Sequence, residues 1–315
     1  MKNKLVVLVQ KDAHNGFVKT KFAQKIVWDI LSYTSITRVK DWKRPKGFRI
    51  EEIERSFLDK RNMSYPFGLT DFVAEKLTEK GYEVEIQEKI FDEFEIIKPE
   101  IPNIIFEDYQ ERVLKVVKNN CRGIIHASTG SGKTISSAGI VSQFNYPVTL
   151  FVTTKKNLLN QTYEDFCKWF PDIDIGRIGD GHCEVGHITV ALYQSLGKWD
   201  LKEYNKQLEL IILDECHKAT EYLGKILKQF TNVYYRFGLS ATVQKIEKDR
   251  QKYFQMIGNI GNVIVEVSDE ECSKRVTDVD LYMLKFKNEN ATGKTYQTSF
   301  REDVLLNPKR NQAII

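Results

Sequence analysis

Short apolar runs alternate with amphipathic stretches in the central part of the chain, and this alternation predicts strands joined by helices. After one of the runs, Leu159, Tyr163, Phe166 and Phe170 recur at helical spacing. The pattern therefore predicts an α/β fold. The runs occupy residues 123–126, 148–154, 188–196 (a strand with its following loop), 209–213 and 263–267.

The first hundred residues follow a different pattern, which predicts a small α+β domain. In residues 64–86, Thr70 can cap a helix and Gly81 can end it before a strand. Pro99 and Pro102 mark an extended connection, so we place a domain boundary near residue 100. The predicted parts are residues 1–100, residues 101–270 and a linker at residues 271–315.

Residues 127–134 (ASTGSGKT) lie between an apolar run and a predicted helix, which is the context that a phosphate-binding loop requires. Gly130 and Gly132 allow a tight turn in which successive N–H groups face one phosphate. We expect Lys133 to reach the β- and γ-phosphates and the Thr134 hydroxyl to ligate Mg²⁺. The alternative is a flexible Gly/Ser turn that happens to hold a lysine, and the flanking periodicity argues against it. The predicted ATP-binding residues of this loop are Thr129, Gly130, Ser131, Gly132, Lys133 and Thr134.

A pair of carboxylates, Asp214 and Glu215, follows the apolar run at 209–213. Carboxylates at the C-terminal end of a parallel strand lie where such sheets bind ligands. We expect Asp214 to hold Mg²⁺, partly through water, and Glu215 to act as general base on an attacking water. Alone, such a pair is usually a solvated turn. Together with the phosphate loop it predicts nucleotide hydrolysis, with Glu215 and Lys133 as the catalytic residues.

Composition indicates a globular enzyme of about two domains. The chain has 315 residues, of which 29% are charged and 42% are apolar. Its five cysteines include no CxxC pair, so neither a disulfide framework nor a zinc site is predicted. His182, Cys183 and His187 are close in sequence, but they lie in a glycine-rich turn that is a poor candidate for a metal site. The apolar run near the N-terminus is too short for a membrane span or a signal, and we expect a cytoplasmic protein.

Positive charge is concentrated at the start of the chain. The net charge is +4, yet residues 1–50 carry twelve Lys and Arg against three Asp and Glu. In residues 38–49, basic side chains are interleaved with Trp42 and Phe48, a composition that suits binding to nucleic-acid phosphates and bases. A solvated basic face is the alternative. The predicted DNA-binding residues of this segment are Lys43, Arg44 and Lys46.

ASTGSGKT, DECH (214–217) and GLSAT (238–242) resemble, in order and spacing, motifs I, II and III of superfamily 2 helicases and translocases. The resemblance implies a RecA-like parallel sheet with helices on both faces, and a site for ATP and Mg²⁺. It also implies that Ser240 and Thr242 link the nucleotide state to nucleic-acid binding.

Three further segments resemble parts of the same family. Residues 106–114 (FEDYQERVL) are similar to its adenine-recognition motif, which implies that Gln110 reads the base edge. Glu107 and Asp108 stand where the family often has Arg or Pro. Residues 148–154 resemble motif Ia, and residues 188–196 resemble the next strand and loop; for each residue there, a core strand with a polar cap is the alternative. The implied DNA-backbone contacts are Thr153, Thr154, Gln194 and Ser195.

The segment 64–86, with PFGL before a predicted helix, resembles the N-terminal domain of UvsW-type branch-migration helicases of tailed phages. The resemblance continues to residues 293–313 and so covers most of the chain. Superfamily 2 motors bind ATP between two RecA-like domains, and about seventy residues follow Thr242, too few for a second one. We therefore expect a fragment that lacks the second motor domain and has weak activity in isolation.

The resemblance implies an ATP-dependent DNA helicase or translocase that acts on branched or duplex DNA in replication, recombination or repair. A restriction- or repair-type translocase that pumps duplex DNA is the alternative within the same class, and RNA is a further substrate to test. A nucleotide-sensing DNA-binding module without useful turnover is the alternative from a different class.

Overall fold

The computed structural model describes residues 4–40, 47–198, 202–218 and 221–272. The predicted DNA-binding residues Lys43, Arg44 and Lys46 lie outside these ranges, as does nearly all of the predicted linker at 271–315. The linker and the missing second motor domain therefore stay predictions.

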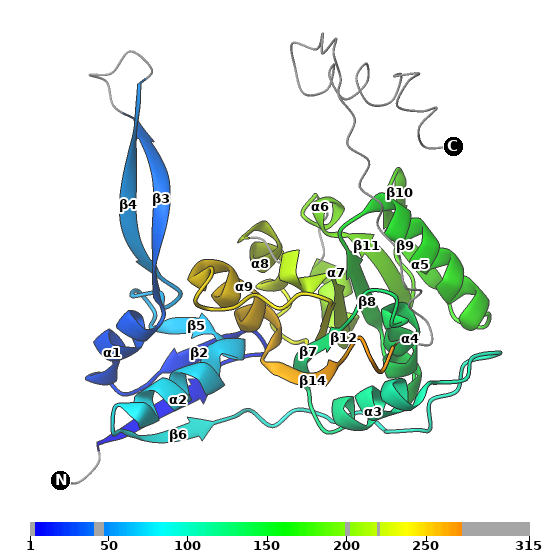
Figure 1. Ribbon diagram of the computed structural model, residues 1–315, viewed down its shortest axis with the longest axis horizontal. Coiled ribbons are helices and arrows are strands. Elements are labelled where there is room, and N and C mark those ends of the chain that lie inside the picture. Colours follow the sequence, from blue (N-terminus) through cyan, green and yellow to red (C-terminus); the bar gives the residue numbers. More distant parts are fainter. Residues whose placement is uncertain (1–3, 41–46, 199–201, 219–220, 273–315) are drawn as a thin grey trace. The chain divides into compact units, whose positions relative to one another are not determined.

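An eight-stranded sheet forms the centre of the second part of the chain (Figure 1). Its strand order is β10-β9-β11-β8-β12-β13-β7-β14, and all neighbouring strands are parallel except β9 and β10. The predicted α/β class with a parallel sheet is confirmed. The strands are β7 (Arg122–Ala127), β8 (Thr149–Thr153), β9 (Ile175–Gly179), β10 (His182–Glu184), β11 (Ile188–Leu192), β12 (Leu210–Asp214), β13 (Tyr235–Ser240) and β14 (Val263–Val267).

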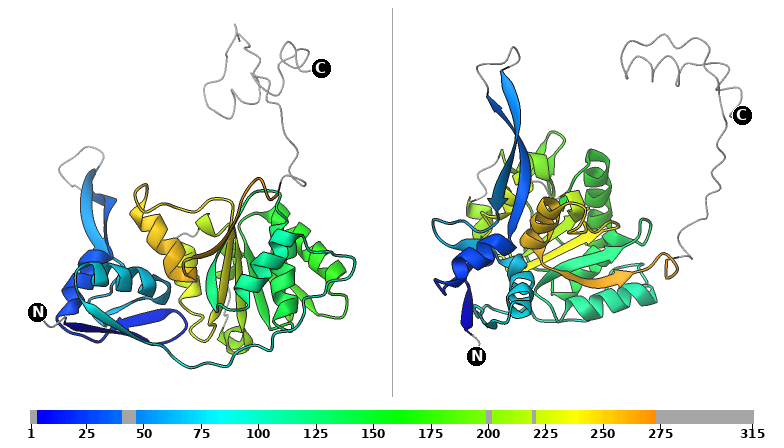
Figure 2. Two further views of the ribbon diagram at one scale, coloured as in Figure 1. Left: turned by 60° about the horizontal axis from the view of Figure 1, so that its bottom comes forward. Right: turned by 60° about the vertical axis from the view of Figure 1, so that its left-hand side comes forward.

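Helices cover both faces of this sheet, as the superfamily 2 resemblance implies (Figure 2). Ile124 and Ile125, adjacent on β7, belong to two separate hydrophobic cores, because successive side chains of a strand point to opposite faces. One core includes α3 (Asp108–Val117), α4 (Lys133–Gln143) and α5 (Lys156–Trp169). The other includes α6 (Tyr193–Leu196), α7 (Lys202–Gln207), α8 (Glu221–Leu227) and α9 (Arg250–Ile260). None of the helices in the described ranges is long and apolar enough to cross a membrane.

A smaller sheet is built from the first part of the chain, in the order β5-β2-β1-β6. Its core is continuous with the α9 face of the large sheet, since Val27, Leu77 and Phe254 belong to one cluster of buried residues. The division at residue 100 stays a prediction. The elements are β1 (Leu5–Gln10), β2 (Asn15–Val18), β5 (Ser64–Pro66), β6 (Glu83–Gln87), α1 (Ala23–Ile30), α2 (Thr70–Glu79) and the 3₁₀ turn η1 (Phe67–Leu69).

A long hairpin, which we did not predict, joins α1 to β5. Its strands β3 (Ser32–Lys40) and β4 (Phe48–Ser56) pair antiparallel from Ser32 opposite Ser56 to Lys40 opposite Phe48. Neither face of this ribbon is buried, so the alternation of apolar and polar residues that marks a half-buried strand is weak. The described residues of the charged segment 38–49 thus belong to the end of β3 and the start of β4.

The predicted cap of α2 is wrong. Thr70 is the first residue of the helix, and its hydroxyl donates to the Phe67 carbonyl at 2.7 Å. The N-cap position belongs to Leu69, because the 3₁₀ turn η1 leads directly into the helix. The predicted end is correct, since Gly81, with φ of 81°, follows the C-cap residue Lys80.

Candidate nucleotide-binding and hydrolysis site

The predicted motifs gather along one edge of the eight-stranded sheet. The strands β7, β13, β12, β8 and β11 are consecutive neighbours, and one predicted segment lies at the carboxyl end of each. Because these strands are parallel, their carboxyl ends share one edge. In strand order, the segments are the phosphate loop, GLSAT, DECH, the Thr153 and Thr154 pair, and the Gln194 and Ser195 pair.

The phosphate loop, residues 128–132, leads from β7 into α4. Gly130 and Gly132 have φ of 85° and 72°, in the left-handed region that favours glycine. The loop ends at a helix N-terminus, where unpaired backbone N–H groups can bind an anion. Ser131 is 2% exposed, and its Oγ has no hydrogen-bond partner among the described residues. Such an orphaned hydroxyl fits a loop that is completed by a ligand oxygen.

Lys133 is the first residue of α4, and its ammonium points back across the loop. It donates to the carbonyl oxygens of Ala127 at 3.3 Å and Ser128 at 3.0 Å. Phosphate oxygens bear more charge than carbonyl oxygens and form stronger bonds with an ammonium. The side chain is therefore placed to exchange these carbonyls for a phosphate. Thr134 is the next residue of the helix and is partly exposed.

Tyr109 and Gln110 of α3 bind the backbone of the phosphate loop. The Tyr109 hydroxyl donates to the Ser131 carbonyl at 3.0 Å, and Gln110 Nε2 donates to the same oxygen at 3.3 Å. Gln110 is fully buried, and its Oε1 accepts from the Glu107 backbone N–H at 3.0 Å. The proposed reading of adenine by Gln110 stays a prediction. Sequence reasoning missed Tyr109, although its position next to Gln110 was a usable signal.

Asp214 ends β12, and Glu215 follows it. Burial, and after it the Glu215 charge, raise the pKa of Asp214 to about 6, whereas the Lys133 ammonium lowers it. Lys133 and Asp214 are therefore close enough to interact, although they lie on separate elements. Glu215 has φ of 52°, an uncommon conformation for a residue with a Cβ, and strained backbone of this kind concentrates at functional sites.

His217, to which we assigned no role from the sequence, joins the carboxylate to the GLSAT segment. Its Nδ1 lies 3.1 Å from Glu215 Oε2 and 2.8 Å from Ser240 Oγ. The Ser240 hydroxyl donates to the Thr242 carbonyl at 2.6 Å, so His217 is the donor to Ser240. Burial lowers the pKa of His217, and the Glu215 charge opposes that effect. The side chains of Glu215, His217 and Ser240 and the Thr242 backbone thus form one continuous contact path from the predicted base to the predicted coupling residues.

The predicted DNA-backbone residues lie at the carboxyl ends of β8 and β11. The Oγ1 atoms of Thr153 and Thr154 are buried and have no hydrogen-bond partner within the described part of the chain. Gln194 and Ser195 lie in the short helix α6 rather than in the predicted loop, because the chain turns into a helix directly after β11. Gln194 is exposed and Ser195 is partly exposed. Their contact with DNA stays a prediction.

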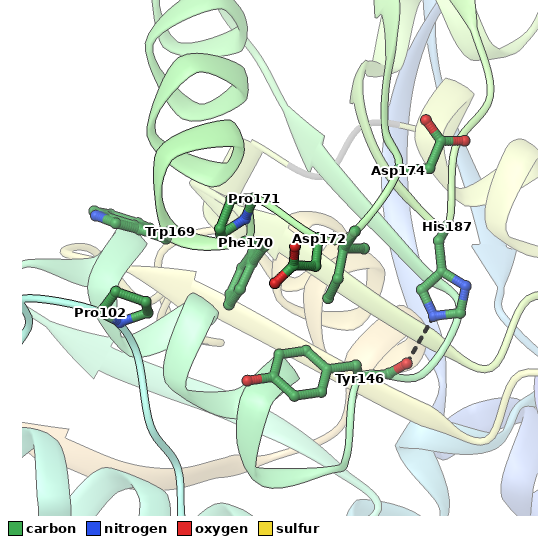
Figure 3. A pocket seen from close by; sticks show the side chains of 9 residues that line it. Pro102, Tyr146, Trp169, Phe170, Pro171, Asp172, Asp174 and His187 are labelled. Carbon is green, nitrogen blue, oxygen red and sulfur yellow. Dashed lines mark hydrogen bonds between the residues drawn. The ribbon is translucent and has the colours of Figure 1, made fainter.

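A separate cavity of about 580 Å³ lies at the opposite edge of the sheet, with aromatic walls from Tyr146, Trp169 and Phe170 (Figure 3). Tyr146 precedes β8 and His187 precedes β11, which places this cavity at the amino ends of the strands. The His187 Nε2 atom lies 2.7 Å from the Tyr146 carbonyl oxygen. The cavity is therefore distinct from the edge that carries the motifs.

Comparison with known proteins agrees with this geometry. The DNA 3'-5' translocase XPB2 of Sulfurisphaera tokodaii is 33% identical over 180 residues, which cover 56% of this chain and 40% of that protein. The ATP-dependent DNA helicase uvsW of Enterobacteria phage T4 is 26% identical over 298 residues, which cover 88% of this chain and 57% of that protein. The chain thus spans about half the length of these curated relatives.

A solved structure shares the fold. The crystal structure of the UvsW helicase from bacteriophage T4 matches with a TM-score of 0.62 at 19% identity, over 83% of this chain and 99% of that chain. The predicted resemblance to superfamily 2 helicases of the UvsW type is confirmed. The ResIII family, described as "Type III restriction enzyme, res subunit", matches residues 83–245, which hold the phosphate loop, DECH and GLSAT, and the chain belongs to this family.

Proposed function

We propose that this chain is the ATP-binding part of an ATP-dependent DNA helicase or translocase. The observation that carries the proposal is the convergence of the phosphate loop, Asp214 and Glu215 at one sheet edge, with Lys133 close enough to lower the pKa of Asp214. This arrangement suits hydrolysis of a nucleoside triphosphate. The names of the matched relatives, a DNA translocase and a DNA helicase, support DNA as the partner.

The residues present fit Mg·ATP. The orphaned Ser131 Oγ and the left-handed Gly130 and Gly132 form a cradle for phosphate oxygens. Thr134 and Asp214 would hold Mg²⁺, partly through water, and the ion would neutralise charge on the phosphates. Lys133 binds the terminal phosphate oxygens.

Glu215 is the proposed general base. Its carboxylate takes a proton from the attacking water, and the contact with His217 at 3.1 Å keeps its Oε2 in one orientation. Because His217 also contacts Ser240, a change in the charge on Glu215 reaches Ser240 and Thr242. An arginine from a second RecA-like domain would complete the site.

The hairpin β3–β4 is the proposed DNA-contacting element of the first part of the chain. One of its faces carries Ile36, Phe48 and Ile50, which are 74%, 53% and 71% exposed. Arg38 pairs with Ile50 and Lys40 with Phe48 across the strands, so basic groups flank the apolar row. Exposed apolar side chains beside cations suit contact with bases and phosphates. Lys43, Arg44 and Lys46, which lie outside the described residues, are the further proposed DNA-binding residues of this segment.

The proposed substrate is branched or duplex DNA, and the proposed place of action is the cytoplasm. ATP hydrolysis should be measured with single-stranded, linear duplex, forked and four-way DNA, and with RNA. Stronger stimulation by forked or four-way DNA than by linear duplex supports remodelling of branches, and equal stimulation by all duplexes supports a translocase. Stimulation by RNA alone would remove DNA from the proposal. Mg·ATP binding without turnover on any substrate would leave a nucleotide-sensing module.

A further inference from the structure

Helix α9 connects the two regions to which the proposed function assigns ATP and DNA. It comprises the 11 residues Arg250–Ile260 and is about 16 Å long at 1.5 Å per residue. In the chain it follows the GLSAT segment, because Ser240 ends β13 and residues 241–249 lead into the helix. Asp249 caps the helix by accepting from the Lys252 N–H at 2.9 Å.

The C-terminal end of α9 packs on the GLSAT and DECH segments. A Cβ added to Gly238 would lie 2.7 Å from Ile260 Cδ1 and 2.9 Å from Cys216 Sγ. Gly238 belongs to GLSAT and Cys216 to DECH. The end of α9 is therefore tightly packed against both the GLSAT strand β13 and the DECH segment. Cys216 also directly follows Glu215. A shift of the DECH segment therefore has to displace α9 or be blocked by it, since packed interiors are not continuously deformable.

The N-terminal end of α9 holds the root of the hairpin. Arg250 donates from Nη2 to the Ile30 carbonyl at 2.6 Å and from Nε to the Ser32 carbonyl at 2.7 Å. Ile30 is the last residue of α1, and Ser32 is the first residue of β3. One guanidinium thus binds the backbone on both sides of the point where the chain enters the hairpin.

The middle of α9 is fixed to the small sheet as well. The Phe254 ring packs edge-on against Phe57, the residue after β4, at 5.6 Å between centroids. A Cβ added to Gly68 of the PFGL segment would lie 2.2 Å from the Ile257 carbonyl oxygen. The backbones of α9 and the Gly68 turn are in close contact at this point, so a displacement of the helix has to shift the small sheet or be resisted by it.

We propose that α9 carries the nucleotide state from the DECH and GLSAT segments to the hairpin, and that Arg250 is the positioning residue that makes this connection. The proposal rests on the proposed function, in which the hairpin contacts DNA. Arg250 touches neither nucleotide nor DNA; it acts by fixing the direction of β3. Arginine suits the task because its planar fork serves two carbonyls at once, whereas a lysine offers one point charge.

The test measures coupling rather than turnover. The affinity of the full chain for a forked DNA should be measured by fluorescence anisotropy without nucleotide, with Mg·ADP and with a Mg-bound non-hydrolysable ATP analogue. We expect the wild-type affinity to change by about fivefold or more between nucleotide states, a typical coupling between two sites. In Arg250→Ala we expect this ratio to fall below about twofold, while the affinity for the ATP analogue without DNA is unchanged.

Two further variants make the result specific. Lys252→Ala removes a neighbouring cation of α9 that pairs with Asp249 at 3.1 Å, and it should keep the wild-type ratio. Arg250→Lys keeps the charge with a single donor group, should retain part of the ratio, and replaces Arg250→Ala if that variant does not fold. A wild-type ratio in Arg250→Ala, or in Arg250→Lys where it replaces that variant, would overturn the proposal, as would DNA binding that is the same in every nucleotide state of the wild type. Absence of DNA binding altogether would instead contradict the proposed function.

Discussion

The carboxyl edge of the large sheet and the hairpin β3–β4 are both rich in charged residues, but they differ in how those charges are held. At the sheet edge, Lys133, Asp214 and Glu215 are partly buried, and burial raises the pKa of Asp214 to about 6. On the hairpin, Arg38 and Lys40 are exposed beside an apolar row. The first region suits chemistry on one small ligand, and the second suits contact with an extended, charged partner.

The two environments indicate where substitutions should act. A partly buried site residue has a role that no other residue duplicates, so its removal should cause a large and specific loss of activity. An exposed cation contributes one of several similar phosphate contacts, so its removal should cause a small and additive loss.

The largest effect is expected at Glu215. Glu215→Gln keeps the size and the hydrogen bonding of the side chain but removes the base, so DNA-stimulated ATP turnover should fall by about a hundredfold or more. Mg·ATP binding should persist, and Glu164→Gln, an exposed site on α5, should leave turnover unchanged. Steady-state ATPase assays check both points, and full turnover in Glu215→Gln would move the base elsewhere.

A large loss of stability is expected at the contact between α9 and the small sheet. In Gly68→Ala the new methyl group meets the Ile257 carbonyl, so backbone has to shift, and the free energy of unfolding should fall by about 1–3 kcal/mol. Gly224→Ala is the matched control, because its nearest neighbour, Asn259 Nδ2, would be 3.5 Å away. Urea denaturation measures both variants. Equal stability of the two would show that the small sheet is loosely attached.

The hairpin should show the additive behaviour. Replacing Arg38 and Lys40 together by Ala should weaken binding to DNA of any sequence and reduce the log–log salt slope by about 0.7–0.9 for each lost contact. Lys115 and Lys168, exposed on α3 and α5, provide the control double variant. Binding isotherms at three salt concentrations measure the slope. An unchanged slope would show that the hairpin is a solvated basic face that does not contact DNA.

The smallest effect concerns a buried histidine between the two sheets. Burial, and after it the charges of Arg236 and Arg122, lower the pKa of His14 well below its usual value, and its Nδ1 accepts from Arg236 Nη1 at 3.1 Å. At His14 the unfolded chain therefore binds a proton near pH 6.5 that the folded chain does not, so the contribution of this histidine to stability should decrease as pH falls below about 6.5, by up to about 1.4 kcal/mol per unit. His14→Gln should have a shallower dependence from pH 7 to pH 5, measured by urea denaturation. Parallel curves for the two proteins would contradict the assignment.

Much of the large sheet could be predicted, because its strands are buried on both faces and appear as continuous apolar runs. The observed β14 has the predicted bounds, and β8 and β12 differ from the predicted runs by one residue at each end. The motif residues could be placed on one edge, because parallel strands bring their carboxyl ends together.

Other features depend on contacts that a linear pattern does not contain. The hairpin has no buried face, so its sequence lacks the alternation of apolar and polar residues by which a half-buried strand is predicted. The roles of Tyr109 and His217 arise from side chains that meet across elements, at Ser131 and at Ser240. The hydrogen bonds of Arg250 to Ile30 and Ser32 join residues more than two hundred positions apart, and no local sequence pattern predicts them.

Binding of Mg·ATP at the phosphate-loop edge of the sheet underlies every role proposed for this chain, and thermal unfolding with and without Mg·ATP decides whether it occurs there. A ligand that binds only the folded chain stabilises it by about 2.7 kcal/mol at a hundred times its Kd. We expect a clear rise in Tm for the wild type and for Lys115→Ala, and none for Lys133→Ala. An equal rise in all three proteins would contradict this site, because the ATP would then be bound away from Lys133.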